Sequence, residues 1–173
     1  MPTEAEEALA DARWYLVRAQ TGREAFAVEQ LERQAFVTFL PKQPKSVRHA
    51  RRVTVKLGAY FPGYLFVQLD IARQRWRSIN GTLGVVHLVG RGDRPAPVPK
   101  GVVEALQAAA DPRGVLQGPP LQAGQQVRII AGAFADKLAV IERLDEAGRV
   151  RVLLEIVSGR VPVTIGREMI GEP

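Results

Sequence analysis

Hydrophobic and polar residues alternate along residues 13–106 with the period of a strand in some segments and of a helix in others. Strands are predicted over 14–19, 39–40, 59–70 and 84–89, and helices over 25–36, 71–79 and from 99 onwards. In the first helix, Val28, Leu31 and Ala35 are spaced three and four apart and share one face. Residues 21–24 (TGRE) before it have the sequence of a capping box. The order strand, helix, hairpin, helix, strand, helix predicts a small α+β sandwich.

After residue 120 the pattern changes to four short runs typical of strands, separated by turn residues. The runs are 126–130, 138–144, 149–157 and 160–165. So short a segment has little room for helices, and we predict that residues 121–173 close as a small SH3-like barrel. Residues 107–120 carry several prolines and glycines without sustained periodicity, which predicts a flexible linker between two domains.

The segment 59–70, AYFPGYLFVQLD, is apolar on both faces of its predicted strand. The alternate residues on one face suit a core and comprise Phe61, Leu65, Val67 and Leu69. The alternate residues on the other face include Tyr60, Pro62, Tyr64 and Phe66. Either a helix of the fold covers this second face or a partner does. Alternation alone favours a covering helix, because large apolar side chains are usually buried.

Positive charge is concentrated in one part of the chain, whose formal net charge is +6. Residues 1–12 are acidic and predict a short frayed tail, whereas residues 13–105 hold 16 Lys/Arg against 6 Asp/Glu. Within residues 42–56 six basic side chains occur with no acid among them. Such a segment can contact the phosphates of a nucleic acid, although a solvated hairpin tip would have the same composition.

Several classes of activity lack the residues that they need. The sequence contains no cysteine, which excludes disulfides, thiol catalysis and cysteine-ligated zinc. His49 and His87 are the two histidines, and the glycines of residues 90–95 (GRGDRP) do not have the spacing of a phosphate-binding loop. No apolar run is long enough to cross a membrane. We therefore expect a cytoplasmic protein that is not an enzyme and has no cofactor, metal or membrane partner.

Three motifs resemble the NusG family of transcription elongation factors: FPGY (61–64) after a basic loop, SINGTLGVVHLVGRGDRPAPVP (78–99) and AGQQVRIIAGAFAD (123–136). By this resemblance, residues 13–106 form an NGN domain and residues 121–173 a KOW domain. LERQA (31–35) and YLFVQLD (64–70) look closer to the RfaH-type paralogues, whereas GDRPAP and GAFAD look like housekeeping NusG. The motifs therefore do not decide between the two subfamilies.

The resemblance implies a monomeric elongation and antitermination factor that suppresses pausing and has three binding sites. The clamp helices of the largest RNA polymerase subunit would be bound by Tyr60, Phe61, Pro62, Tyr64 and Phe66. Upstream or non-template DNA would be contacted by Arg23, Lys45, Arg48, Arg51 and Arg52. A ribosomal protein of the NusE type or the termination factor Rho would be contacted by Phe134, Ile156 and Val157.

Two alternatives follow from the same resemblance. KOW domains also occur in ribosome-associated and RNA-binding proteins, but such a protein should have a basic barrel, and residues 121–173 are neutral. In RfaH-type proteins the second domain can fold as a helical hairpin over the docking face. The β-branched residues of this segment, with Gly148, Gly159 and Pro162, disfavour helix, so we predict a barrel in the free protein.

Overall fold

The computed structural model describes residues 11–116, 118, 121–145, 149–156 and 159–173. Contacts divide the chain into two compact units. One is Met1–Gln43 with Gly58–Gln117, and the other is Pro44–Leu57 with Gly118–Pro173. The basic segment 44–57 therefore groups with the C-terminal β-domain, although it lies between two strands of the first unit in sequence.

The first unit is built on a four-stranded antiparallel sheet with the order β2-β5-β1-β6. Its strands are β1 (Arg13–Ala19), β2 (Val37–Phe39), β5 (Tyr64–Leu69) and β6 (Val85–Leu88). β1 and β5 are central, and Leu16 of β1 faces Phe66 of β5. The register between β1 and β6 shifts between Arg18 and Ala19.

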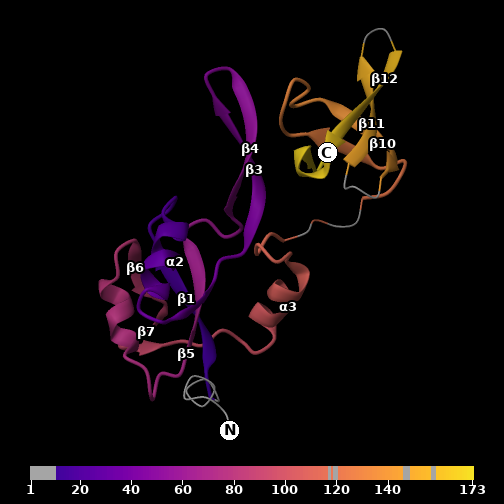
Figure 1. The fold of residues 1–173 in the computed structure, drawn as a ribbon. Coiled ribbons are helices and arrows are strands. Elements are labelled where there is room, and N and C mark those ends of the chain that lie inside the picture. Colours follow the sequence, from indigo (N-terminus) through magenta and orange to yellow (C-terminus); the bar gives the residue numbers. More distant parts are fainter. Residues whose placement is uncertain (1–10, 117, 119–120, 146–148, 157–158) are drawn as a thin grey trace. The chain divides into compact units, whose positions relative to one another are not determined.

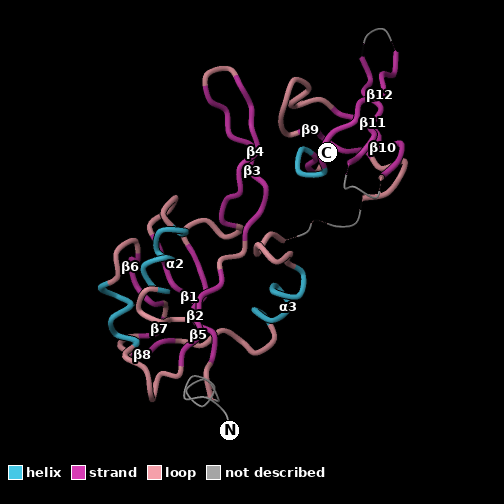
Figure 2. The backbone as a smooth tube through the Cα atoms, in the orientation of Figure 1, coloured by secondary structure: helices cyan, strands magenta, loops and turns pink. Residues whose placement is uncertain are grey.

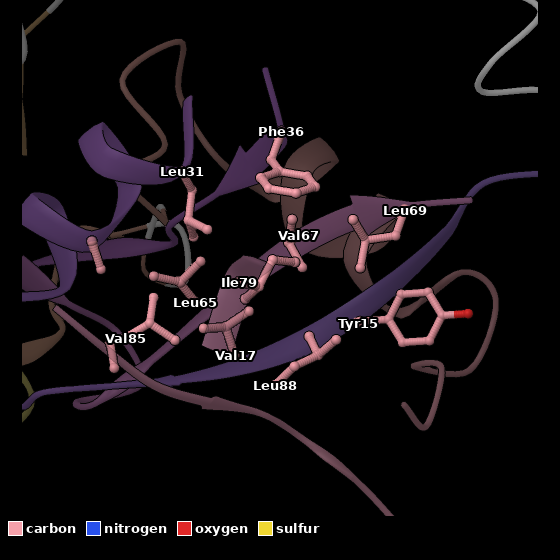
Figure 3. Close-up of a cluster of buried hydrophobic side chains, with 12 residues drawn as sticks. Tyr15, Val17, Leu31, Phe36, Leu65, Val67, Leu69, Ile79, Val85 and Leu88 are labelled. Atoms are coloured by element: carbon pink, nitrogen blue, oxygen red, sulfur yellow. The ribbon is translucent and has the colours of Figure 1, made fainter. Parts of the chain in front are cut away.

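One face of this sheet is covered by α2 (Glu24–Glu32) and the 3-10 helix η1 (Trp76–Gly81). Figure 3 shows the resulting core, in which Leu31, Leu65 and Ile79 are fully buried. The predicted capping box at residues 21–24 is wrong, because the N-cap of α2 is Arg23 and has no side-chain cap hydrogen bond. The predicted helix over 71–79 is reduced to η1, and the Asp70 carboxylate accepts the Ala72 N–H in the turn before it (2.9 Å).

The opposite face carries the third helix, α3 (Val102–Ala109). Val103 of α3 forms a buried cluster with Trp14 of β1 and Phe66 of β5. Partly buried residues complete this cluster: Leu16, Phe39, Val98 and Leu106. The sequence-based alternative of a covering helix is therefore correct for the part of the face around Phe66.

A long two-stranded hairpin consists of β3 (Lys42–His49) and β4 (Arg52–Ala59), and is visible in Figure 1. Ala50 and Arg51 at its tip have φ angles of 47° and 66°. Two left-handed residues in a two-residue loop match a type I′ turn, whose twist suits antiparallel strands. A smaller hairpin in the first unit pairs β7 (Gly90–Arg91) with β8 (Arg94–Pro95).

The C-terminal part of the second unit is a five-stranded antiparallel sheet with the order β12-β11-β10-β9-β13. Its strands are β9 (Gln126–Ile129), β10 (Leu138–Leu144), β11 (Arg149–Ile156), β12 (Gly159–Gly166) and β13 (Ile170–Gly171), with the 3-10 turn η2 (Arg167–Met169) before the last. Figure 2 shows strands through this region. Ile141, Val152 and Leu154 lie in its core. The prediction of strands is confirmed, and the helical hairpin is not the state of the described residues.

The segment after α3 differs from the predicted linker. Residues 107–109 complete α3, and Lys42 forms an isolated bridge with Val115. The Lys42 N–H donates to the Gly114 carbonyl, and the Leu116 N–H donates to the Lys42 carbonyl, both at 2.8 Å. Residues up to 116 are therefore held on the first unit, because their backbone groups find partners at the base of β3.

Candidate functional site

A tight turn at residues 61–64 presents the aromatic residues that precede β5. The Tyr64 N–H donates to the Phe61 carbonyl (3.0 Å), and Gly63 has a φ angle of 80°. Pro at the second position and a left-handed Gly at the third are the requirements of a type II turn. The predicted strand 59–70 is thus interrupted, since β4 ends at Ala59 and β5 begins at Tyr64.

Two aromatic side chains at this turn are exposed. Tyr60 is 40% exposed and Phe61 is 38% exposed. Their ring centroids lie 4.9 Å apart in an edge-to-face arrangement. Tyr64 is half-buried, and the Arg18 guanidinium carbon lies 4.7 Å from its ring centroid, within cation–π distance. We refer to Tyr60, Phe61 and Tyr64 as the aromatic surface.

Phe66 does not belong to this surface, contrary to the expectation from the sequence. It is only 6% exposed, because Trp14 and Val103 pack on it. Its ring also lies 6.3 Å from that of Phe61 and 6.3 Å from that of Phe39. Phe66 therefore supports the aromatic surface from below, while Pro62 is exposed in the turn. Sequence alternation could not show that α3 would cover Phe66 and leave Phe61 open.

Four of the predicted nucleic-acid-binding residues lie on the β3–β4 hairpin and are exposed: Lys45, Arg48, Arg51 and Arg52. The hairpin carries no Asp or Glu that could neutralise them. Arg48 forms an ion pair with Asp136 of the same unit (3.5 Å), and both side chains are more than two-thirds exposed. Such a pair contributes little, so the hairpin offers its charge to an anionic ligand.

Arg23 is not part of this basic group. It belongs to the first unit, at the N-cap of α2, and its guanidinium donates to Gln20 (3.0 Å). The same guanidinium lies 4.6 Å from the Phe26 ring centroid. Local contacts of this kind give Arg23 a structural role, in addition to any that it has toward DNA.

Two of the three predicted partner-binding residues of the second unit are exposed. Phe134 is 40% exposed in the turn between β9 and β10, and Ile156 is 45% exposed at the end of β11. Gly132 has a φ angle of 84° and allows this turn to reverse direction. Val157 lies outside the described residues. Leu138 and Val161, which the sequence analysis did not select, are also exposed.

A buried carboxylate that no sequence pattern indicated is hydrogen-bonded to the turn of the aromatic surface. Glu24 is 7% exposed, and its Oε1 atom accepts hydrogen bonds from the N–H groups of Gly22 (3.0 Å) and Gly63 (2.7 Å). The sequence pattern assigned Glu24 to a capping box, and so its contact with Gly63 was not predicted. Only the fold brings these two residues together, because 39 positions separate them in the sequence.

The described residues contain no group of three or more His, Asp or Glu side chains placed to hold a metal ion. Asp111 has a pKa below its ordinary value, first because the Arg113 side chain hydrogen-bonds to it. This carboxylate belongs to the turn after α3 and not to the aromatic surface. Among the residues that the structure describes, no helix is long and apolar enough to span a membrane.

Two family models match this sequence. Residues 12–107 match NusG, described as transcription termination factor nusG, and residues 123–155 match the KOW motif. The NusG transcription termination/antitermination protein of Thermus thermophilus is 28% identical over 172 residues, covering 88% of this chain and 94% of that protein. The corresponding protein of Deinococcus radiodurans is 30% identical over 182 residues, with coverages of 88% and 94%. A solved structure of Thermotoga maritima NusG is 21% identical, with coverages of 93% and 97% and a TM-score of 0.42.

Proposed function

Because this chain belongs to the NusG family, whose members are transcription termination/antitermination factors and not enzymes, we propose that it binds elongating RNA polymerase through the aromatic surface. The surface docks on the clamp helices of the largest polymerase subunit. Docking there favours the closed clamp, and a closed clamp suppresses pausing.

The exposure of Tyr60 and Phe61 is the observation that carries this proposal. Other aromatic side chains of the first unit, such as Trp14 and Tyr15, are buried. Exposed aromatic side chains on an ordered turn form a contact that can bury much apolar area at little cost in side-chain entropy. A helical partner with an apolar face, such as a clamp helix, can pack against exposed aromatic rings of this kind.

The β3–β4 hairpin contacts the DNA of the transcription complex. Its exposed basic side chains bind phosphates, which adds affinity and fixes position without reading bases. Upstream and non-template DNA are the candidates, because both present backbone phosphates beside the polymerase.

The second unit recruits a further protein through exposed apolar side chains such as Phe134 and Ile156. Both side chains are exposed and apolar, which suits a protein partner better than a nucleic acid. A ribosomal protein of the NusE type or Rho is the expected partner.

The proposal is tested with purified core RNA polymerase and the full-length chain, by affinity capture followed by chemical crosslinking and mass spectrometry. Crosslinks should join residues around 56–64 to the clamp helices. Absence of binding, or crosslinks confined to another part of the polymerase with none near this turn, would refute the docking site.

A further inference from the structure

The peptide groups of Gly63, at the centre of the aromatic turn, are held on both sides by elements that precede it by about 40 residues. Its N–H donates to the Glu24 carboxylate (2.7 Å), and its carbonyl accepts the Ala19 N–H (2.9 Å). Glu24 is the first residue of α2, and Ala19 is the last residue of β1. The turn is therefore fixed to the sheet and to α2 at a single residue.

A side chain at Gly63 would displace the end of the Arg18 side chain. A Cβ atom built there would lie 2.7 Å from Arg18 Nη1 and 3.1 Å from Thr21 Oγ1. The left-handed φ angle of 80° disfavours other residues as well. Arg18 is thus confined between Gly63 and the Tyr64 ring, and this confinement links the turn to one member of the aromatic surface.

The Glu24 carboxylate is the group on which this arrangement depends. It is buried, and it accepts two backbone N–H groups, which a carboxylate does more strongly than a neutral oxygen. Without it, the Gly22 and Gly63 N–H groups would lose their acceptor. A buried N–H without an acceptor is unfavourable, so the turn would move to reach water.

We infer that Glu24 is a positioning residue for polymerase binding: it holds the 61–64 turn in one conformation, so that Tyr60 and Phe61 are already placed before the partner arrives. The inference rests on the proposed docking of the aromatic surface. A preorganised surface binds more tightly because less conformational entropy is lost on binding. Glu24 itself is buried, and its effect is transmitted through Gly63.

The test uses the full-length chain with Glu24→Ala and Glu24→Gln. Glu24→Ala should lower the affinity for core RNA polymerase by about tenfold, the effect expected when a buried donor loses its acceptor. Glu24→Gln should retain most of the affinity, because the amide oxygen can still accept both N–H groups. In the free protein, amide hydrogen exchange at Gly63 should accelerate in Glu24→Ala and much less in Glu24→Gln.

Ile79→Val is the matched control, since Ile79 is fully buried in the same unit and contributes to stability away from the turn. It should leave the affinity and the Gly63 exchange rate unchanged. Should Glu24→Ala fail to fold, Gly63→Ala displaces the same turn with the carboxylate intact and should lower the affinity in the same way.

Three results would overturn the inference, and they are distinguishable. If Phe61→Ser abolishes polymerase binding while Glu24→Ala accelerates exchange but binds like the wild type, docking stands and positioning fails. If Gly63 exchange is unchanged in Glu24→Ala, the carboxylate does not hold the turn. If both Phe61→Ser and Glu24→Ala bind like the wild type, the proposed docking fails, and the inference fails with it.

Discussion

At the scale of single residues, neighbouring aromatic side chains of one motif have different physical roles. Phe61 is exposed at the turn, whereas Phe66 is buried between Trp14 and Val103. Alternation alone assigned Phe61 to the core and favoured a helix over the face of Phe66, whereas the family resemblance placed both rings in the docking site; the structure exposes Phe61 and buries Phe66. A pattern of period two fails here because the type II turn breaks the strand at Gly63.

Substitution of these two residues should therefore affect the free energy of unfolding differently. Phe66→Ser removes a buried aromatic ring and should lower it by about 3 kcal/mol or more. Phe61→Ser should lower it by about 1 kcal/mol or less, because the ring is already partly in water. Urea denaturation followed by tryptophan fluorescence measures both. Equal losses for the two variants would show that Phe61 is a core residue.

At the scale of elements, the segment after α3 has ordered backbone contacts that its composition did not predict. Its prolines and glycines predict a linker, yet Asp111 organises a turn by accepting the N–H groups of Arg113 (2.8 Å) and Val115 (3.0 Å). The bridge between Val115 and Lys42 joins residues far apart in sequence, so no local pattern could reveal it. The strands of the second unit were predictable, because alternating β-branched residues and intervening turn residues specify them locally.

The Asp111 turn should make stability depend on pH in acid. Hydrogen bonds from the Arg113 side chain, and then from the Val115 N–H, lower the pKa of Asp111 below its ordinary value of 3.8. The folded state therefore favours the ionised form, whose contribution is present above the ordinary pKa and is lost as pH falls through the folded pKa. The difference in unfolding free energy between the wild type and Asp111→Asn should shrink over that range. A difference that stays constant with pH would contradict this assignment.

The β3–β4 hairpin should determine how polymerase-complex binding responds to salt. Neutralising Arg48, Arg51 and Arg52 together should lower affinity and reduce the slope of log affinity against log salt by at most about 3, since each phosphate contact releases counterions. The effect should be alike across DNA sequences. A matched control neutralises three exposed basic residues of the first unit, Arg91, Arg94 and Lys100, with the same change in net charge. A loss confined to one DNA sequence would mean that the hairpin reads bases.

At the scale of the whole molecule, the chain divides into two compact units, and the proposed binding sites are distributed over both. Its family and its α+β class could be inferred from the sequence, because short motifs such as FPGY and GAFAD and the periodicity of strands and helices are local features of the chain. The hydrogen bond from the Gly63 N–H to Glu24, which holds the aromatic turn, could not be inferred from the sequence, because these residues meet only in the folded chain. Under our proposal this surface binds the polymerase, and exposed apolar area elsewhere on the unit does not.

The decisive measurement is the dissociation constant for core RNA polymerase of a Tyr60→Ser, Phe61→Ser double variant. The comparison is a Leu83→Ser, Val86→Ser double variant, which removes two apolar side chains that are at least as exposed in the same unit. Our account predicts that the first variant binds at least about tenfold more weakly, as expected for the loss of two central aromatic contacts, while the second binds like the wild type. Equal affinities for both variants and the wild type would contradict it.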